Sequence, residues 1–232
     1  MTEFAAAVAP EIDRVTIAVH PVAKPAAVVV LRAAGLSRGG LLVSLLTPLL
    51  AGPALAAELH SINRYMPYAE FRAGLDEHVR QGMLRRSGDV VAATDSGRAV
   101  LTGLRRAQGT AVTGMLAGHD VAVARLRPLV DRALAAADGG VAFGLMTPPE
   151  AAESSAHALH DRITALRYHR ADAHAAAWAA AGLTAASVPT LEGPDRERIE
   201  TETNRRAGQP YAALSDAERT TLLADLSGLR GW

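Results

Sequence analysis

The sequence predicts a mainly helical fold, and two observations support this prediction. Apolar residues make up 49 % of the chain but aromatic residues only 4 %, so the core is expected to consist of Ala, Leu and Val. Alanine and leucine are strong helix formers. Apolar residues also recur at helical spacing between prolines and glycines, which commonly end helices. A chain of 232 residues is long enough for one large or two small domains.

The helices expected in the first quarter of the chain span residues 5–19, 24–34, 38–50 and 54–65. Further helices are expected near residues 121–136, 150–181, 195–207 and 215–229. In the last of these, Ser215 and Glu218 have the spacing of a capping box. The longest uncharged stretch, residues 41–57, is interrupted by Pro48 and Pro53, and a spanning helix needs about 20 apolar residues.

The first ten residues contain Glu3 and no basic residue, which argues against a signal peptide. The chain has no cysteine, so disulfides, thiolate metal sites and a cysteine nucleophile are excluded. Lys and Arg together number 24, the same as Asp and Glu, which gives no general electrostatic case for nucleic acid or for an acidic membrane. We therefore expect a soluble cytoplasmic protein without a membrane segment.

One segment predicts a helix, a hairpin and a second helix in succession. Phe71, Leu75 and Val79 recur every four residues and predict a short helix with one buried stripe. Residues 83–86 and 90–93 then read as two short strands joined by the polar turn Ser87-Gly88-Asp89. Thr94 or Ser96 can cap the helix that begins near Gly97.

This order of elements, with its TDSGRAVL helix start, resembles that of the MarR-like regulators. The resemblance covers about 55 residues and implies a winged helix-turn-helix unit with a small two-stranded β-wing. It also implies a possible homodimer formed through terminal helices. We expect N-terminal helices in residues 1–53, the winged unit in residues 54–108, and a helical bundle in residues 109–232.

DNA binding by this unit is possible but disfavoured. On the helix that would enter the major groove, the outward positions include the carboxylates of Glu70, Asp76 and Glu77, which would face phosphates. The turn of the wing carries no basic side chain. Between Glu58 and Arg106 there are eight arginines and six acidic residues, an excess of two, and a DNA-binding surface usually has more.

Most of the candidate functional side chains, namely histidines, arginines and an aspartate, lie in the helix expected after residue 150. Leu159, Ile163, Leu166, Ala173 and Ala177 fall on one face, which predicts the core side. Arg170 falls within that apolar arc, so its guanidinium must be paired or must face a polar cavity. Beside it, His160, Arg167, His174 and Trp178 form a second stripe. We take these side chains as candidate lining of a ligand pocket.

The string LRYHRADAHAAAWAAAGL, with the later RRAGQPYAALSDAERTTLLADL, resembles a poorly characterised actinobacterial helix-turn-helix family. That family has an L-R-x-H-R-x-D-x-H late helix, and Arg167, His169, Arg170, Asp172 and His174 occupy its pattern positions. In the family the winged unit lies between these two elements, whereas here it precedes them. The resemblance therefore implies a functional site at these positions, but it does not indicate which reaction the site would perform.

In chemical terms, His174, His169 and Asp172 are the candidate catalytic residues, because a histidine beside Arg and Asp can act as an acid or base near neutral pH. Arg167, Arg170, His160 and Trp178 are the candidate ligand-binding residues, the arginines for an anionic group. His169 and Asp172 point more toward the other side of the helix. The alternative is that all these side chains form an inter-helix salt-bridge network or a solvated face.

A metal site has one supporting pattern, since Glu153, His157 and His160 share one helical face. Pairs of histidines at this spacing are common by chance, and the neighbouring Ser154-Ser155 indicates a frayed helix start, so we predict neither a metal nor a cofactor. The favoured hypothesis is a repurposed winged-helix protein that sequesters a small organic ligand, or performs cofactor-free acid/base chemistry on it, in specialised metabolism or self-resistance. The alternative hypothesis is a ligand-responsive, DNA-binding transcription regulator.

Overall fold

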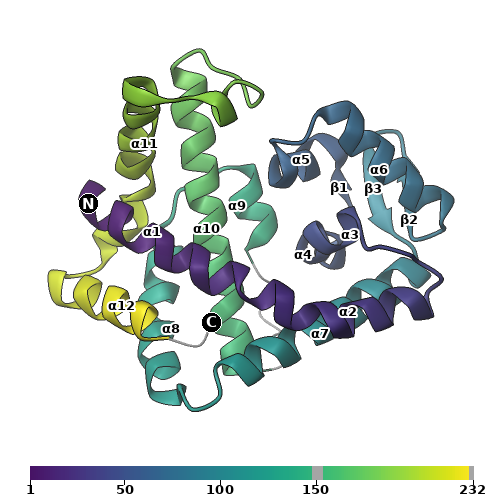
Figure 1. Cartoon of the computed structure of the whole chain (residues 1–232), viewed down its shortest axis with the longest axis horizontal. Helices are drawn as coiled ribbons and strands as arrows, with labels where there is room; N and C mark the ends of the chain where they lie inside the picture. The colour runs from purple at the N-terminus through teal and green to yellow at the C-terminus, as the bar shows by residue number, and fades with distance from the viewer. Residues whose placement is uncertain (148–153, 230–232) are drawn as a thin grey trace. The chain divides into compact units, whose positions relative to one another are not determined.

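The computed structural model of the chain confirms a mainly helical fold, with one small antiparallel sheet (Figure 1). It describes residues 1–147 and 154–229. The chain divides into two units, one formed by Val19–Ala111 and the other by Met1–Ala18 together with Val112–Trp232. Residues 19–53 thus belong with the expected winged segment, whereas the sequence placed a boundary after residue 53.

The unit formed by Val19–Ala111 contains six helices or helical turns, three strands and the start of a long helix. In chain order these are α2 (Val19–Ala33), α3 (Leu41–Ser44), α4 (Leu46–Ala51), β1 (Ala54–Leu55), α5 (Ala56–His60), η1 (Ser61–Asn63), α6 (Tyr68–Arg80), β2 (Leu84–Ser87), β3 (Val90–Ala93) and α7 (Asp95–Met115).

The ends of the first helices in this unit differ from the sequence-based expectation. The first break lies at Ala18 and not at Pro21, which is in the first turn of α2. Proline is tolerated in a first turn because the missing N–H would have no partner there. The helix expected at residues 38–50 is instead the two short helices α3 and α4.

The sheet has three strands in the order β1-β3-β2, where the sequence predicted a wing of two. The hairpin of β2 and β3 lies at the predicted place, with Leu84 opposite Ala93. The extra strand, β1, pairs antiparallel with β3 through Ala54 opposite Val91 and Leu55 opposite Val90. The sequence predicted a helix from residue 54, but the helix begins only at Ala56, after these two residues have joined the sheet.

Helix α6 buries a stripe that differs from the predicted one at its last position. Phe71 and Leu75 are fully buried, but the next buried side chain is His78, while Val79 is half-buried. His78 Nδ1 lies 2.9 Å from Gln81 Oε1, and burial lowers the pKa of His78. Because His78 also hydrogen-bonds to the backbone of Gly39, this neutral imidazole joins α6 to the turn before α3.

Helix α7 begins where the sequence predicted a cap. Thr94 Oγ1 accepts a hydrogen bond from the Gly97 N–H at 3.0 Å, and the Thr94 N–H donates to the Met83 carbonyl at 3.0 Å. The helix then continues through Gly103, where a Cβ would lie 2.8 Å from Val30 of α2. That glycine therefore allows α2 and α7 to pack closely side by side (Figure 1).

The other unit is entirely helical in its described residues. Its elements are α1 (Thr2–Ile17), the end of α7, α8 (Asp120–Ala136), α9 (Val141–Met146), α10 (Ser155–Ala180), η2 (Val188–Thr190), α11 (Gly193–Ala207), η3 (Gln209–Ala213) and α12 (Asp216–Gly228).

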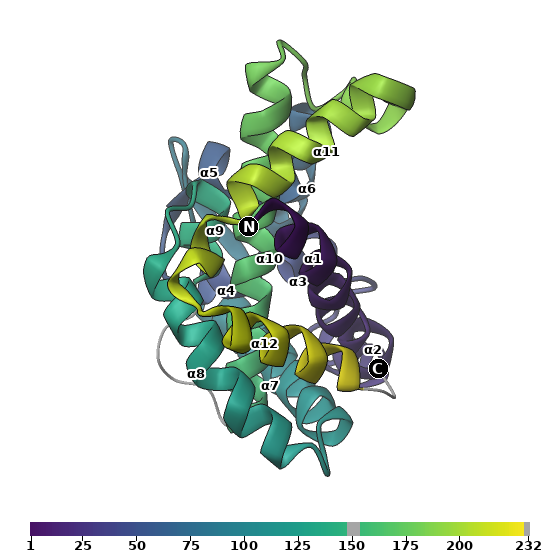
Figure 2. The same ribbon diagram turned by 90° about the vertical axis from the view of Figure 1, so that its left-hand side faces the viewer.

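Helix α10 is the centre of this second unit, and it contacts α1, α8, α9 and α11 (Figure 2). Leu159, Ile163 and Leu166 are buried, as predicted for its core face. The capping box of α12 is also confirmed: the Glu218 N–H donates to Ser215 Oγ at 3.3 Å, and the Ser215 N–H donates to Glu218 Oε2 at 2.9 Å. The late helices therefore lie close to their predicted positions.

One helical run, Thr2–Ala33, is long and apolar enough to cross a membrane by length and composition. Core helices of water-soluble proteins pass the same test. In α1 the apolar side chains have a protein environment, since Val8, Ile12 and Val15 are buried. The buried side chains of α1 are typical of a core helix, whereas only 22 % of the most apolar window of the whole run is buried.

Candidate ligand-binding site

Arg170, the arginine predicted on the apolar face of α10, is paired with side chains of α11. Its Nη2 donates to Glu200 Oε2 at 2.9 Å, and its Nη1 donates to Asn204 Oδ1 at 2.5 Å. The hollow that adjoins it measures about 10 Å³, which is the space of a single water molecule. An organic ligand cannot enter that space, so the guanidinium is neutralised by the protein itself.

The other basic residues of the predicted pocket also have protein partners. Arg167 Nε donates to Asp13 Oδ1 of α1 at 2.7 Å. His174 Nδ1 lies 3.7 Å from Glu200 Oε1 and 3.5 Å from Thr203 Oγ1, both on α11. Arg167 therefore ties α10 to α1, and His174 joins Arg170 on the side of α11. These contacts match the salt-bridge network that the sequence left open as an alternative.

His169 and Asp172 face a third neighbour, the loop and helix of α9. Asp172 Oδ2 accepts a hydrogen bond from the Phe143 N–H at 2.9 Å, which caps the short helix α9. His169 is 4 % exposed, packs edge-on against Phe143 at a ring-centre distance of 5.6 Å, and hydrogen-bonds to the backbone of Asp138. Burial lowers the pKa of His169, so the imidazole is neutral near neutral pH.

The two remaining candidates lie away from these groups along α10. His160 is buried near the start of the helix, and Trp178 is half-buried near its end. The structure does not test the metal pattern, because Glu153 lies outside the described residues. Within residues 1–147 and 154–229, no group of three His, Asp or Glu side chains is placed to hold a metal ion. The seven candidates therefore do not converge on one pocket.

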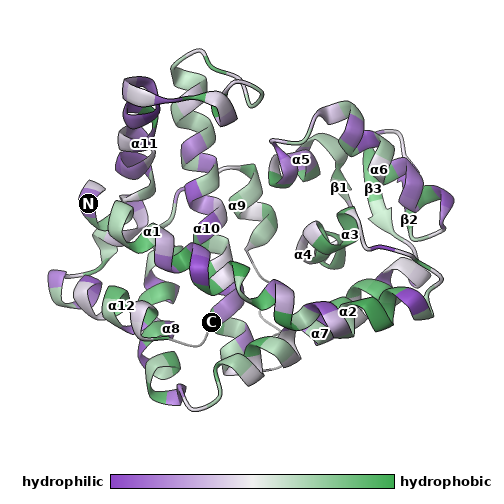
Figure 3. Cartoon of the chain, in the orientation of Figure 1, coloured by the Kyte–Doolittle hydropathy of each residue, from purple (hydrophilic) through white to green (hydrophobic). Residues whose placement is uncertain are grey.

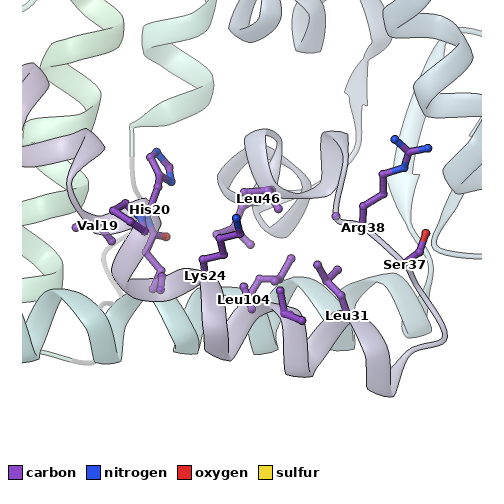
Figure 4. Close-up of a pocket in the computed structure, with 15 residues that line it drawn as sticks. Val19, His20, Lys24, Leu31, Ser37, Arg38, Leu46 and Leu104 are labelled. Carbon is purple, nitrogen blue, oxygen red and sulfur yellow. The ribbon is translucent and has the colours of Figure 1, made fainter.

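A larger cavity lies in the other unit, and none of the site residues predicted from the sequence lines it. It measures about 490 Å³ and is enclosed by α2, the turn before α3, the helices α3 and α4, and α7 (Figure 4). Its lining is mainly apolar, with Leu31 of α2, Leu46 of α4 and Leu104 of α7 contributing large side chains. A volume of this size suits an organic molecule of a few rings.

The charged side chains of this cavity are all of one sign. Among its 15 lining residues are Lys24 and Arg38, and none is Asp or Glu. Neither cation forms an ion pair with any residue in the described part of the chain. Figure 4 shows Lys24 extending from α2 toward Leu46, with His20 and Arg38 at opposite ends of the cavity. The site is thus an apolar hollow with a positive potential.

Its walls come from segments far apart in the sequence, which explains why periodicity did not reveal it. One signal was present: Lys24 is the single lysine of the chain, and it stands in an apolar helix. Comparisons of the chain with protein-family models, with curated proteins and with solved structures give no match.

Proposed function

We propose that this protein binds a small organic acid in the cavity enclosed by α2, α3, α4 and α7. The observation that carries the proposal is a 490 Å³ apolar hollow whose lining holds no carboxylate and two cations that form no ion pair with a described residue. An apolar body would be removed from water there, and an acidic group would meet Lys24. The proposed function is to bind this organic acid in the cytoplasm, without a cofactor and without converting it to a product.

The proposed scaffold is a winged helix-turn-helix like that of the MarR-like regulators. The order β1, α5, α6, β2, β3, α7 supports it, as does the pairing of β1 with β3. In that assignment α6 occupies the place of the recognition helix, and the hairpin of β2 and β3 is the wing. The cavity then lies behind α6, on the side of α2 and α7.

The surface of α6 and the hairpin supports a scaffold that has lost DNA recognition. Arg72 Nη1 lies 3.3 Å from Asp89 Oδ1, and Arg86 Nη1 lies 3.1 Å from Asp76 Oδ1. Arg80 pairs with Glu77 on the same helix. These arginines are already neutralised, and phosphate contacts would have to displace the carboxylates that hold them.

The alternative function, a dimeric regulator that binds DNA, is favoured only by the order of the elements. We expect no retardation of duplex DNA from the protein's own upstream region in an electrophoretic mobility assay, even at low salt. Circular dichroism on the same sample checks that the protein is folded. A retarded band whose affinity falls steeply with rising salt would instead establish the regulator.

The organic-acid proposal is tested with anilinonaphthalene sulfonate (ANS), an apolar ring system that carries one sulfonate. We expect saturable fluorescence enhancement, and a loss of affinity of about tenfold when Lys24→Met removes the ammonium group. Arg32→Met, which removes an exposed charge of α2 outside the cavity, is the matched control and should change little.

N-phenylnaphthylamine, which has the same rings without the sulfonate, separates the two parts of the proposal. It should bind wild-type protein and Lys24→Met equally. Equal binding of ANS by wild type and Lys24→Met would exclude the role of the charge, and no binding of either dye would exclude the cavity as a ligand site.

A further inference from the structure

A second cavity lies in the unit formed by Met1–Ala18 and Val112–Trp232, and it is polar. It measures about 370 Å³ and is enclosed by the loop before α9, by α10, by the end of α11 and by η3. Its chemistry comes from six side chains: Asp138, His169, Asp172, Arg205, Arg206 and Gln209. Charges of both signs therefore face one hollow, in contrast to the cavity beside Lys24.

The acidic side of this cavity is held in place by the fold. Asp172 is fixed by the hydrogen bond that it accepts from the Phe143 N–H. The position of Asp138 is fixed through its backbone, whose N–H donates to Gln209 Oε1 at 3.1 Å. The carboxylate of Asp138 forms no ion pair with any other described residue. It is thus available to a cation.

The basic side comes from α11, which is hydrophilic along most of its length (Figure 3). Arg205 Nε and Arg206 Nε donate to the two oxygens of Glu202 at 2.7 and 2.6 Å. These hydrogen bonds lower the pKa of Glu202 to about 2, and the bond from Arg205 has the larger effect. Glu202 is therefore ionised at neutral pH. Two guanidinium groups share one carboxylate, which leaves one positive charge in excess.

The remaining lining of the cavity consists of a histidine and small residues, which carry no charge. His169 is neutral at neutral pH because it is buried, so it adds no further cation. Ala173 and Ala176 of α10 also line the cavity and present only methyl groups. The hollow therefore offers one basic region, one acidic region and a short apolar surface.

We propose that this cavity binds a small zwitterion with the chemistry of a free α-amino acid. Its carboxylate would contact Arg205 and Arg206, and its ammonium group would contact Asp138 and Asp172. Ala173 and Ala176 would contact a short apolar side chain. A ligand with one charge would leave the other charged region of the cavity unmatched, which disfavours its binding relative to that of a zwitterion. This site is separate from the organic-acid cavity and does not depend on it.

The test uses three molecules with related carbon chains. Norvaline carries both charges, pentanoate lacks the ammonium group, and butylamine lacks the carboxylate. In saturation-transfer NMR on the full chain, we expect norvaline to bind, and the two singly charged molecules to bind more weakly by about tenfold or more. Equal binding of pentanoate or butylamine would overturn the proposal, as would an absence of norvaline binding.

Two substitutions locate the binding in this cavity. Asp138→Asn and Arg206→Gln should each weaken norvaline binding by about fivefold to tenfold. Asp195→Asn and Arg198→Gln, which alter an exposed ion pair of α11 outside the cavity, are the matched controls and should leave it unchanged. Because the Asp138 carboxylate forms no hydrogen bond or ion pair with another described residue, its variant should keep a thermal midpoint close to that of the wild type. Unchanged norvaline affinity in Asp138→Asn would overturn the proposed site.

Discussion

Replacing Ala27 by tryptophan is expected to reduce the affinity for ANS by about tenfold or more, because the indole would fill the cavity between α2, α4 and α7. Ala27 is half-buried on the face of α2 that lines the cavity. The measurement is a fluorescence titration of the variant and the wild type. Thermal unfolding of both proteins checks that the fold persists.

The neighbouring alanine provides the matched control for this experiment. Ala26 is exposed on the same helix and does not line the cavity. Ala26→Trp adds the same side chain to solvent and should leave the ANS affinity unchanged. If Ala26→Trp and Ala27→Trp behave alike, ANS binds somewhere other than this cavity.

The largest expected effect on stability is that of Gly97→Ala, at the start of α7. A Cβ at this position would lie 1.8 Å from the carbonyl oxygen and 2.8 Å from the carbonyl carbon of Met83. Backbone atoms cannot move aside as a side chain can, so we expect a loss of about 3 kcal/mol or more in the free energy of unfolding. Urea denaturation followed by circular dichroism measures this loss.

Gly114 lies on the same helix and gives the opposite expectation. A Cβ there would meet no atom within 4 Å. Gly114→Ala should therefore stabilise the protein by about 0.5 to 1 kcal/mol, the helix preference of alanine over glycine. If Gly97→Ala and Gly114→Ala had equal free energies of unfolding, the close contact between Gly97 and the Met83 carbonyl group would be contradicted.

Much of the fold could be predicted because its signals are local. The hairpin turn, the Thr94 cap and the Ser215 capping box each depend on residues within a few positions of one another. Strand β1 could not be predicted in this way. Ala54 and Leu55 have no strand pattern of their own and become a strand only because Val90 and Val91 lie beside them.

The candidate site was less predictable, because it depends on partners distant in the sequence. Periodicity placed Arg170 on the apolar face of α10, and in the structure its side chain is 26 % exposed and is paired with α11. The identity of that partner was not predictable: Glu200 and Asn204 lie on another helix, and Asp13, which pairs with Arg167, lies near the other end of the chain. The same distance hid the cavity beside Lys24.

The most direct test of the proposed function is a crystal structure of the protein soaked with ANS. We expect density for the ring system between α2 and α7, against Leu46 and Leu104, with the sulfonate within hydrogen-bonding distance of Lys24. Density for the dye beside Arg170 on α10, with the cavity of α2 empty, would contradict the proposal.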